Sequence, residues 1–295
     1  MASSGLAPFA WPVLLRESMR RIHAEEITRR VAEAVVEACI RLPDEVCAHL
    51  KRAQEEEISQ LGQKALGILL ENADLAQKEG LPICQDTGIV VVFVELGEDV
   101  EVKDLYAAIN KGVAEGYEKG RLRKSVADPL TRKNTGTNTP AIIHVRLVPG
   151  DRLRLYILPK GCGSENMSRL AMLPPAEGEE GIKRFVIETV SLAGANPCPP
   201  VTVGVGIGGT FEKAALLAKW ALCRPIGEPA RRRDVAMLEA DILKQINRLG
   251  IGPLGFGGRT TALAVHIETF PSHIASLPVA VNLQCHAARL TRLEF

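Results

Sequence analysis

The sequence of 295 residues has almost no net charge and no long apolar run. Lysine and arginine total 36 against 35 aspartate and glutamate, which leaves a formal net charge of +1 at pH 7. A balance this even provides no general attraction for nucleic acid or an anionic membrane surface. No apolar segment approaches the roughly 18 residues that a membrane-spanning helix requires. We therefore expect a protein that binds neither nucleic acid nor membranes.

The N-terminal residues lack the pattern of a secretory signal. Met1 to Gly5 carry no positive side chain ahead of the apolar stretch from Leu6 to Leu15, whereas a signal peptide begins with a positive region. The arginines that follow alternate with Glu17, Glu25 and Glu26 in an amphipathic pattern, which is typical of a surface helix rather than a transit peptide. We expect a cytoplasmic protein.

The seven cysteines form neither a disulfide framework nor a zinc motif. Their number is odd, and no two of them have C-x-x-C spacing. Cys39, Cys47 and Cys223 lie in or beside helical patterns, where cysteine usually serves as a small buried apolar residue. The other four lie in loops marked by proline or glycine, or at strand ends: Cys84, Cys162, Cys198 and Cys285.

Hydrophobic periodicity predicts an α+β fold, with a helical N-terminal portion followed by a mixed β-sheet and flanking helices. Apolar residues recur at helical spacing over residues 14–80, and Gly80 is a natural end for the last of these helices. Further helices are predicted at 102–119, 182–193 and 211–223, and in a segment that reaches residue 249. Strands are predicted at 89–94, 141–148, 152–158, 201–207, 260–267 and 279–283.

A predicted turn and the lack of any linker complete the fold prediction. Pro149-Gly150-Asp151 separates two of the predicted strands and indicates that they form a hairpin. The sequence shows no internal repeat, low-complexity tract or clear linker. We therefore expect a single domain over residues 1–295.

The stretch Pro82-Ile83-Cys84-Gln85-Asp86-Thr87-Gly88 places a thiol, an amide and a carboxylate side by side. Strand formers follow at once, so a rigid element can present these side chains to a ligand. A thiolate favours soft metals and iron–sulfur clusters, and the carboxylate of Asp86 can transfer protons. The alternative is a buried structural Cys84 beside an Asx-turn.

A second loop, Lys160–Asn166, directly follows a predicted strand. Its glycines, including Gly161 and Gly163, let backbone amides approach a ligand. Lys160 adds a positive charge, so the loop is suited to binding an anion.

Two more loops carry the remaining thiols of this group. Prolines stiffen the backbone on both sides of Cys198, and Cys285 follows a strand. Three thiols in separate stiffened loops suit a cluster held by three thiolates, and the alternative is that all three are structural. Three thiolates leave one iron open as a Lewis acid, which suits adding or removing water next to a carboxylate. Asp86 could then transfer the proton, and Arg123 and Lys160 are candidates to hold the substrate carboxylates.

One motif points to a different class of ligand. Gly204 to Gly209 satisfy G-x-G-x-x-G ahead of a helix, as in a dinucleotide-binding fold. However, the glycines fall inside the predicted strand rather than after it, which argues against nicotinamide binding. His266, His273 and His286 lack zinc-ligand spacing and are interpreted as structural.

Taken together, these motifs resemble the class I, iron–sulfur fumarases, and more closely the α subunit of their two-subunit forms. The related two-subunit L-tartrate dehydratases share the pattern. The resemblance covers nearly the whole chain after about residue 20. It rests on the segments Leu81–Gly88, Pro159–Ser168, Cys198–Thr210, Ile246–Pro253 and His273–Val281, and on Cys285.

The resemblance implies roles for particular residues. It makes Cys84, Cys198 and Cys285 the ligands of a [4Fe–4S] cluster with one open iron. It implies substrate contacts from Gln85, Asp86, Arg123, Lys160, Gly161 and Gly163, with Asp86 also catalytic. In this family glycine usually occupies the position of Cys162, so we leave Cys162 out of the ligand set.

The same resemblance implies a C4 dicarboxylate substrate and a separate β subunit that completes the active site. It also implies that the complex is a dimer of αβ pairs. We expect reversible hydration of fumarate to (S)-malate, with L-tartrate dehydration as the alternative. A third reading, of a different class, is a non-catalytic iron–sulfur sensor with a closed cluster.

Overall fold

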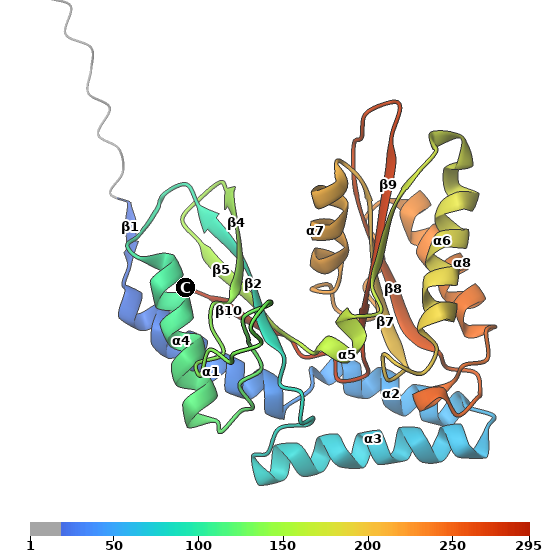
Figure 1. The fold of residues 1–295 in the computed structure, drawn as a ribbon, viewed down its shortest axis with the longest axis horizontal. Helices are drawn as coiled ribbons and strands as arrows, with labels where there is room; N and C mark the ends of the chain where they lie inside the picture. Colours follow the sequence, from blue (N-terminus) through green and yellow to red (C-terminus); the bar gives the residue numbers. More distant parts are fainter. Residues whose placement is uncertain (1–18) are drawn as a thin grey trace, which may run out of the picture.

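The computed structural model describes residues 19–295 (Figure 1). Its helical N-terminal portion consists of α1 (Ala24–Ile40), α2 (Asp44–Glu56) and α3 (Gln60–Glu79). The helical prediction for residues 14–18 lies outside the described residues. The prediction was wrong for Arg20–Ile22, which form strand β1 and pair in parallel with β3 (Val100–Val102). Ile22 is buried in the neighbouring core, which holds this short segment against β3.

The first sheet has the strand order β10-β5-β2-β4. These strands are β2 (Ile89–Gly97), β4 (Ile142–Val148), β5 (Leu153–Lys160) and β10 (Thr291–Glu294). Strand β2 lies in the middle, parallel to β4 and antiparallel to β5. Its residues are almost all buried, as expected of a central strand.

The predicted hairpin of residues 141–148 and 152–158 was therefore wrong, because β2 lies between the two strands. The connection at Pro149-Gly150-Asp151 crosses the end of β2 instead of joining neighbours. The amide of Asp99 donates to the carbonyl of Gly150 at 3.1 Å. A side chain at Gly97 would collide with that same carbonyl, so a glycine at the end of β2 makes the crossing possible.

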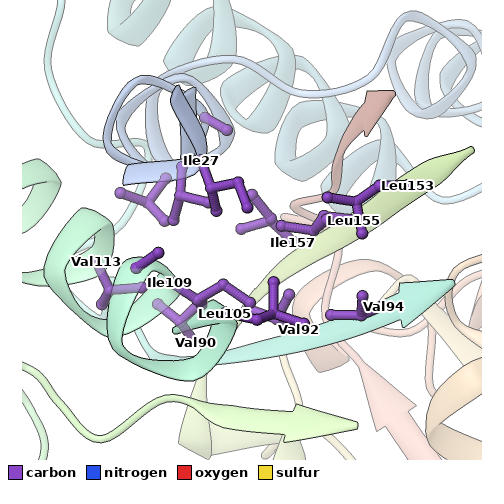
Figure 2. Close-up of a cluster of buried hydrophobic side chains, with 14 of the residues drawn as sticks. Ile27, Val90, Val92, Val94, Leu105, Ile109, Val113, Leu153, Leu155 and Ile157 are labelled. Atoms are coloured by element: carbon purple, nitrogen blue, oxygen red, sulfur yellow. The ribbon is translucent and has the colours of Figure 1, made fainter. Parts of the chain in front are cut away.

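Helices α1 and α4 (Leu105–Lys119) cover one face of the first sheet (Figure 1). Figure 2 shows the core between them, where Ile27, Ile109 and Val113 of the helices meet Val92 of β2 and Leu155 of β5. The two helices lie close together because α4 carries glycines where it contacts α1. The tightly buried apolar layer makes this half of the molecule a firm support for the loop that precedes β2.

The second sheet has the strand order β6-β9-β7-β8. Its strands are β6 (Arg169–Leu173), β7 (Val201–Gly208), β8 (Ala262–Phe270) and β9 (Leu277–Gln284). Helices α6 (Gly178–Ala193) and α8 (Arg233–Asn247) lie on one side and α7 (Phe211–Ala221) on the other (Figure 1). Strand β6 was not predicted.

The glycines of the G-x-G-x-x-G motif lie inside β7, as the sequence interpretation held. A side chain at Gly204 would collide with the carbonyl of Ala218, and one at Gly206 with that of Ala214. Both carbonyls belong to α7. These glycines therefore allow α7 to pack directly on the strand, which is a structural reason for the motif.

The two halves meet above α2 and α3, where the short helix α5 (Cys162–Glu165) and its neighbouring loops lie (Figure 1). The sequence of elements confirms the α+β prediction. Among residues 19–295 no helix is long and apolar enough to cross a membrane.

Candidate active site

Three hydrogen bonds tie together the four cysteine-bearing loops that the sequence singled out. The amide of Cys162 donates to Oδ2 of Asp86 at 2.8 Å. Nη1 of Arg289 donates to the carbonyl of Asp86 at 2.6 Å. Nδ1 of His286 lies 3.0 Å from the carbonyl oxygen of Cys198. Loops from both sheets therefore form one connected structure at the junction of the two halves.

The Cys84 loop is held from below by the helical portion. The amide of Ile83 donates to the carbonyl of Cys39 at 2.9 Å, and the side chain of Asn72 donates to the carbonyl of Ile83 at 2.9 Å. Within the loop, the amide of Asp86 points at the sulfur of Cys84 at 3.4 Å, and Oε1 of Gln85 lies 3.2 Å from the same sulfur.

Both carboxylate oxygens of Asp86 have backbone partners. Oδ1 accepts a 3.0 Å hydrogen bond from the amide of Gly88, which is the Asx-turn considered from the sequence. Oδ2 accepts the hydrogen bond from Cys162. Gly88 has a φ of +79°, and a side chain there would collide with the backbone of Lys160. The carboxylate therefore has a fixed orientation between the first two loops.

Lys160 is completely buried, and its ammonium points into its own loop. It donates to Oγ of Ser164 at 2.6 Å and to the carbonyl of Gly161 at 3.1 Å, and it lies 3.4 Å from the carboxylate of Glu165. Burial lowers the pKa of Lys160 to about 8. In this arrangement the lysine shapes the turn that presents Gly161 and Gly163, and its direct contact with a substrate stays a prediction.

Glu165 connects this loop to the second sheet. Burial alone would raise its pKa, but the ammonium groups of Lys219 and Lys160 hold the pKa of Glu165 below its ordinary value. Lys219 of α7 forms an ion pair with Glu165, and Nδ2 of Asn282 in β9 donates to it at 2.9 Å. This half-buried network fixes α5 in place.

Cys198 has a left-handed backbone, with a φ of +55°. Its carbonyl accepts hydrogen bonds from both the amide and the ring of His286, at 3.3 and 3.0 Å. The neighbouring carbonyl of Pro199 accepts a 2.8 Å hydrogen bond from the amide of Leu254. A conformation that costs energy for a residue with a side chain is thus held by contacts on both sides, and the thiol remains exposed.

Cys198 lies close enough to the other two predicted ligands for their charges to act on its thiol. Partial burial raises the pKa of Cys198, and the neighbouring Cys285 and Cys84 raise it further. Within residues 19–295, no three His, Cys, Asp or Glu side chains surround a point as the ligands of one metal ion would. A [4Fe–4S] cluster is larger, and each thiolate binds a different iron, so its ligands need not surround one point. The donor set of three thiols from three loops fits such a cluster.

Cys162 is exposed and begins α5. Partial burial and the carboxylate of Asp86 raise the pKa of its thiol. Its amide is already engaged by Asp86, so the residue contributes its backbone to the site. The charged groups that act on its thiol are Asp86, Lys160, Glu165 and Lys219.

Arg123 is exposed and is tied to the Cys84 loop through its backbone. The hydroxyl of Thr87 donates to the carbonyl of Arg123 at 2.7 Å. Asn138, fully buried, donates to the carbonyl of Gly88 at 3.1 Å and accepts from the amide of Ser125 at 2.6 Å. The segment that carries Arg123 is therefore fixed beside Asp86, with its side chain free to reach solvent.

Two residues that support the site were not predicted. Arg289 is 1% exposed, and besides holding Asp86 it lies against Gly161, where a side chain would come within 2.9 Å of its guanidinium. Burial raises the pKa of Cys39 to about 11, an effect that Arg289 opposes. Arg289 stands four residues after Cys285, but nothing in the sequence distinguishes a buried arginine from an exposed one.

The second unpredicted residue is Glu57, whose carboxylate is 2% exposed. It accepts backbone hydrogen bonds from Arg259 at 2.8 Å and Thr260 at 3.0 Å, and from Ile58 at 2.9 Å. Gly258, with a φ of +129°, lies against it without room for a side chain. The glycine-rich segment at residues 250–258 thus brings its backbone directly against this carboxylate.

The three histidines have the backbone hydrogen bonds of structural residues. Nδ1 of His266 lies 3.2 Å from the carbonyl of Ala221, and Nδ1 of His273 accepts from the amide of Ala275 at 3.1 Å. His286 holds Cys198 as described. Their interpretation as structural residues agrees with these contacts.

Comparison with known proteins assigns the family. The sequence model of the fumarate hydratase (Fumerase) family matches residues 28–294. The chain therefore belongs to this family, as an α-type subunit of the class I enzymes, and it is a hydro-lyase.

Several curated relatives match over nearly their whole length. A protein of Methanocaldococcus jannaschii, provisionally named L(+)-tartrate dehydratase subunit alpha, is 44% identical over 272 residues, or 90% of this chain and 95% of the relative. The L(+)-tartrate dehydratase subunit alpha of Escherichia coli strain K12 is 33% identical over 281 residues, or 94% and 93% of the two chains. The protein of the same name from Shigella sonnei has the same identity and coverage.

Proposed function

We propose that this chain is the α subunit of an iron–sulfur hydro-lyase that adds water to, or removes it from, a C4 dicarboxylate. The observation that carries the proposal is the hydrogen-bonded set of loops that carries Cys84, Cys198 and Cys285 together with the fixed carboxylate of Asp86. These three thiols would hold a [4Fe–4S] cluster. When bound, such a cluster supplies a Lewis acid at the iron that no thiolate holds.

The residues of the chain would handle the proton and the substrate. Asp86 would transfer a proton at the water that enters or leaves, because its carboxylate is fixed two residues from Cys84. Arg123 would hold a substrate carboxylate, and Gln85 would bind substrate from the same loop. Gly161 and Gly163 would present backbone amides to the other oxygens.

Two substrates are candidates. The name of the family model favours fumarate and (S)-malate, which the sequence analysis placed first. The names of the relatives favour L(+)-tartrate, which carries one more hydroxyl than malate. A site built to bind that hydroxyl can discriminate strongly against the molecule that lacks it. Assays of the same enzyme on both substrates can therefore decide between them.

A separate β subunit would complete the enzyme. In the described site, Asp86 is the carboxylate that we assign to proton transfer, and a dicarboxylate needs cationic groups at both of its ends. The relatives are named as alpha subunits, which supports a division of the site between two chains. We place the whole 295-residue chain in one cluster-binding unit and its complex in a dimer of αβ pairs. All seven cysteines are free, which is consistent with the reducing conditions of the cytoplasm.

The test is to rebuild the cluster without oxygen and to assay the chain with and without a candidate β subunit on (S)-malate and L(+)-tartrate. We expect turnover of one substrate by the complex and almost none by the chain alone. Substantial activity of the isolated chain would overturn the division of the site. A cluster that is stable in air and spectroscopically unchanged by either substrate would favour a sensor over an enzyme.

A further inference from the structure

Helix α3 has an apolar stripe on its outer face. Leu61, Ile68 and Leu75 are 59%, 62% and 54% exposed, and they recur every seven residues along the helix. Seven residues are two helical turns to within about 20°, so the three side chains lie nearly in line. The helix spans 20 residues, and its opposite face packs into the molecule through residues such as Leu66 and Leu69.

The stripe continues beyond both ends of the helix. Ile58, just before α3, is 72% exposed, and Leu81, just after it, is 58% exposed. Figure 1 shows α3 along the outer edge of the molecule, on the side away from both sheets. Single exposed apolar residues are ordinary, but an aligned series of them marks a surface that another molecule covers.

We infer that this stripe is the contact surface between two copies of the chain, with α3 packed antiparallel against α3 of the second copy. The stripe is symmetric about Ile68, because Leu61 and Leu75 lie seven residues to either side. A two-fold axis through Ile68 brings Leu61 of one copy onto Leu75 of the other, and Ile68 onto Ile68. Such self-complementarity is what a two-fold interface requires.

The charges beside the stripe select the same arrangement. Lys64 and Glu71 are both exposed and lie in a second row, three residues after Leu61 and Ile68. In the antiparallel pair, Lys64 of one copy comes within one residue of register with Glu71 of the other, on the same side of the contact. A parallel pair would instead place the two rows on opposite sides of the contact, so Lys64 and Glu71 of one copy would not meet those of the other. The charge pattern therefore fits a second copy in one orientation.

This inference deepens the proposed dimer of αβ pairs by assigning its contact surface, and it is tested by molar mass, which needs neither cluster nor turnover. The full-length chain, measured by light scattering during gel filtration at micromolar concentration, should be a dimer. Ile68→Glu should halve the molar mass while leaving the circular dichroism spectrum unchanged. Met237→Glu, at a 65% exposed position on α8, is the matched control and should remain a dimer.

Charge reversal tests the orientation. Lys64→Glu alone, or Glu71→Lys alone, should raise the dissociation constant about tenfold, since it replaces two attractive pairs by repulsive ones. The double variant Lys64→Glu, Glu71→Lys should restore it. The inference is overturned if the chain is monomeric, if Ile68→Glu stays dimeric, or if the double variant is no better than either single one. Loss of β-subunit binding in an Ile68→Glu chain whose parent is monomeric would assign the stripe to the β subunit instead.

An active hydro-lyase with a monomeric α chain would refute the contact surface and leave the proposed function standing. A dimer that Ile68→Glu dissociates, but that never loads a cluster, would support the contact surface and refute the proposed function. The two results therefore cannot be confused.

Discussion

The backbone amide of Cys162 and the carboxylate of Asp86 are joined by a 2.8 Å hydrogen bond between residues 76 positions apart. The bond connects the glycine-containing loop after β5 to the loop before β2. It uses the main chain of Cys162, so it does not depend on which side chain stands at that position. The carboxylate that we propose to be catalytic is thereby aimed by a second loop of the same site.

Replacing Asp86 by asparagine should lower turnover far more than cluster content. The amide keeps the size of the carboxylate but cannot accept and release the proton, and a positioned acid–base group typically contributes on the order of 10²–10⁴-fold. The measurements are kcat of the reconstituted complex, together with iron and sulfide content. A variant with a normal cluster and a near-normal rate would show that Asp86 is only a turn residue.

Each of the three ligand thiols should be required for the cluster. Cys84→Ser, Cys198→Ser and Cys285→Ser should each lose most of the bound iron and sulfide after reconstitution, because an iron loses its anchor to the protein. Cys162→Gly, which introduces the residue usual in the family, should load normally and serves as the control from the same site. Full loading of the Cys198→Ser protein would refute the ligand assignment.

Glu57→Gln should disturb Cys198 although the two residues are far apart in the sequence. The carboxylate accepts the amides of Arg259 and Thr260, and the same glycine-rich segment holds Pro199 through the amide of Leu254. A glutamine would present an N–H donor where only acceptors fit, so the segment should loosen and stability should fall by about 1–3 kcal/mol.

The specific measurement for Glu57 is the alkylation rate of Cys198 in the cluster-free chain, followed by mass spectrometry. Glu57→Gln should change this rate several-fold, while the rate of the exposed Cys162 stays constant. Glu55→Gln, the same change at an exposed position of α2, is the control. An unchanged Cys198 rate in a destabilised variant would mean that Glu57 serves stability alone.

Burial of His266 makes the protein less stable in mild acid. Burial lowers the pKa of His266 from 6.5 to about 4, so below pH 6.5 the unfolded chain takes up a proton that the folded chain does not. The free energy of unfolding is unaffected by this group above pH 6.5 and declines as the pH falls towards 4. The loss from His266 amounts to about 3 kcal/mol. Urea unfolding at pH 7, 5.5 and 4.5 should show a smaller decline for His266→Gln than for the unchanged protein. Equal declines would locate the acid sensitivity elsewhere.

The sequence was sufficient for those parts of the fold that follow from local pattern. Periodicity located α1 to α3, and the run of strand formers after Gly88 located β2 as the rigid element behind the Cys84 loop. Local sequence pattern could not reveal which strands are neighbours in the sheet. The turn at Pro149-Gly150-Asp151 has hairpin chemistry, but the buried β2 needs a partner on both of its edges, and that tertiary requirement decided the pairing.

For the site, sequence pattern found the residues on the loops and missed those behind them. Cys84, Asp86 and Cys198 stand in stretches of unusual composition. Glu57 and Arg289 stand in ordinary helical or polar surroundings, and their importance comes from burial and from partners more than 200 residues away. Lys160 was predicted as a substrate contact because of its charge, whereas its burial directs that charge into the loop.

Strand β10 and Phe295 give the first half of the molecule a late closing step during synthesis. Phe295 is buried in the core formed by α1, α4 and β2, and the guanidinium of Arg30 lies 4.3 Å from the centre of its ring. Strand β10 fills the edge of β5, so that edge stays unpaired while the whole second sheet is being made. A ribosome-bound chain therefore exposes an open strand edge and an incomplete core until residues 291–295 emerge, which is the period when association with other unfinished chains is most favoured.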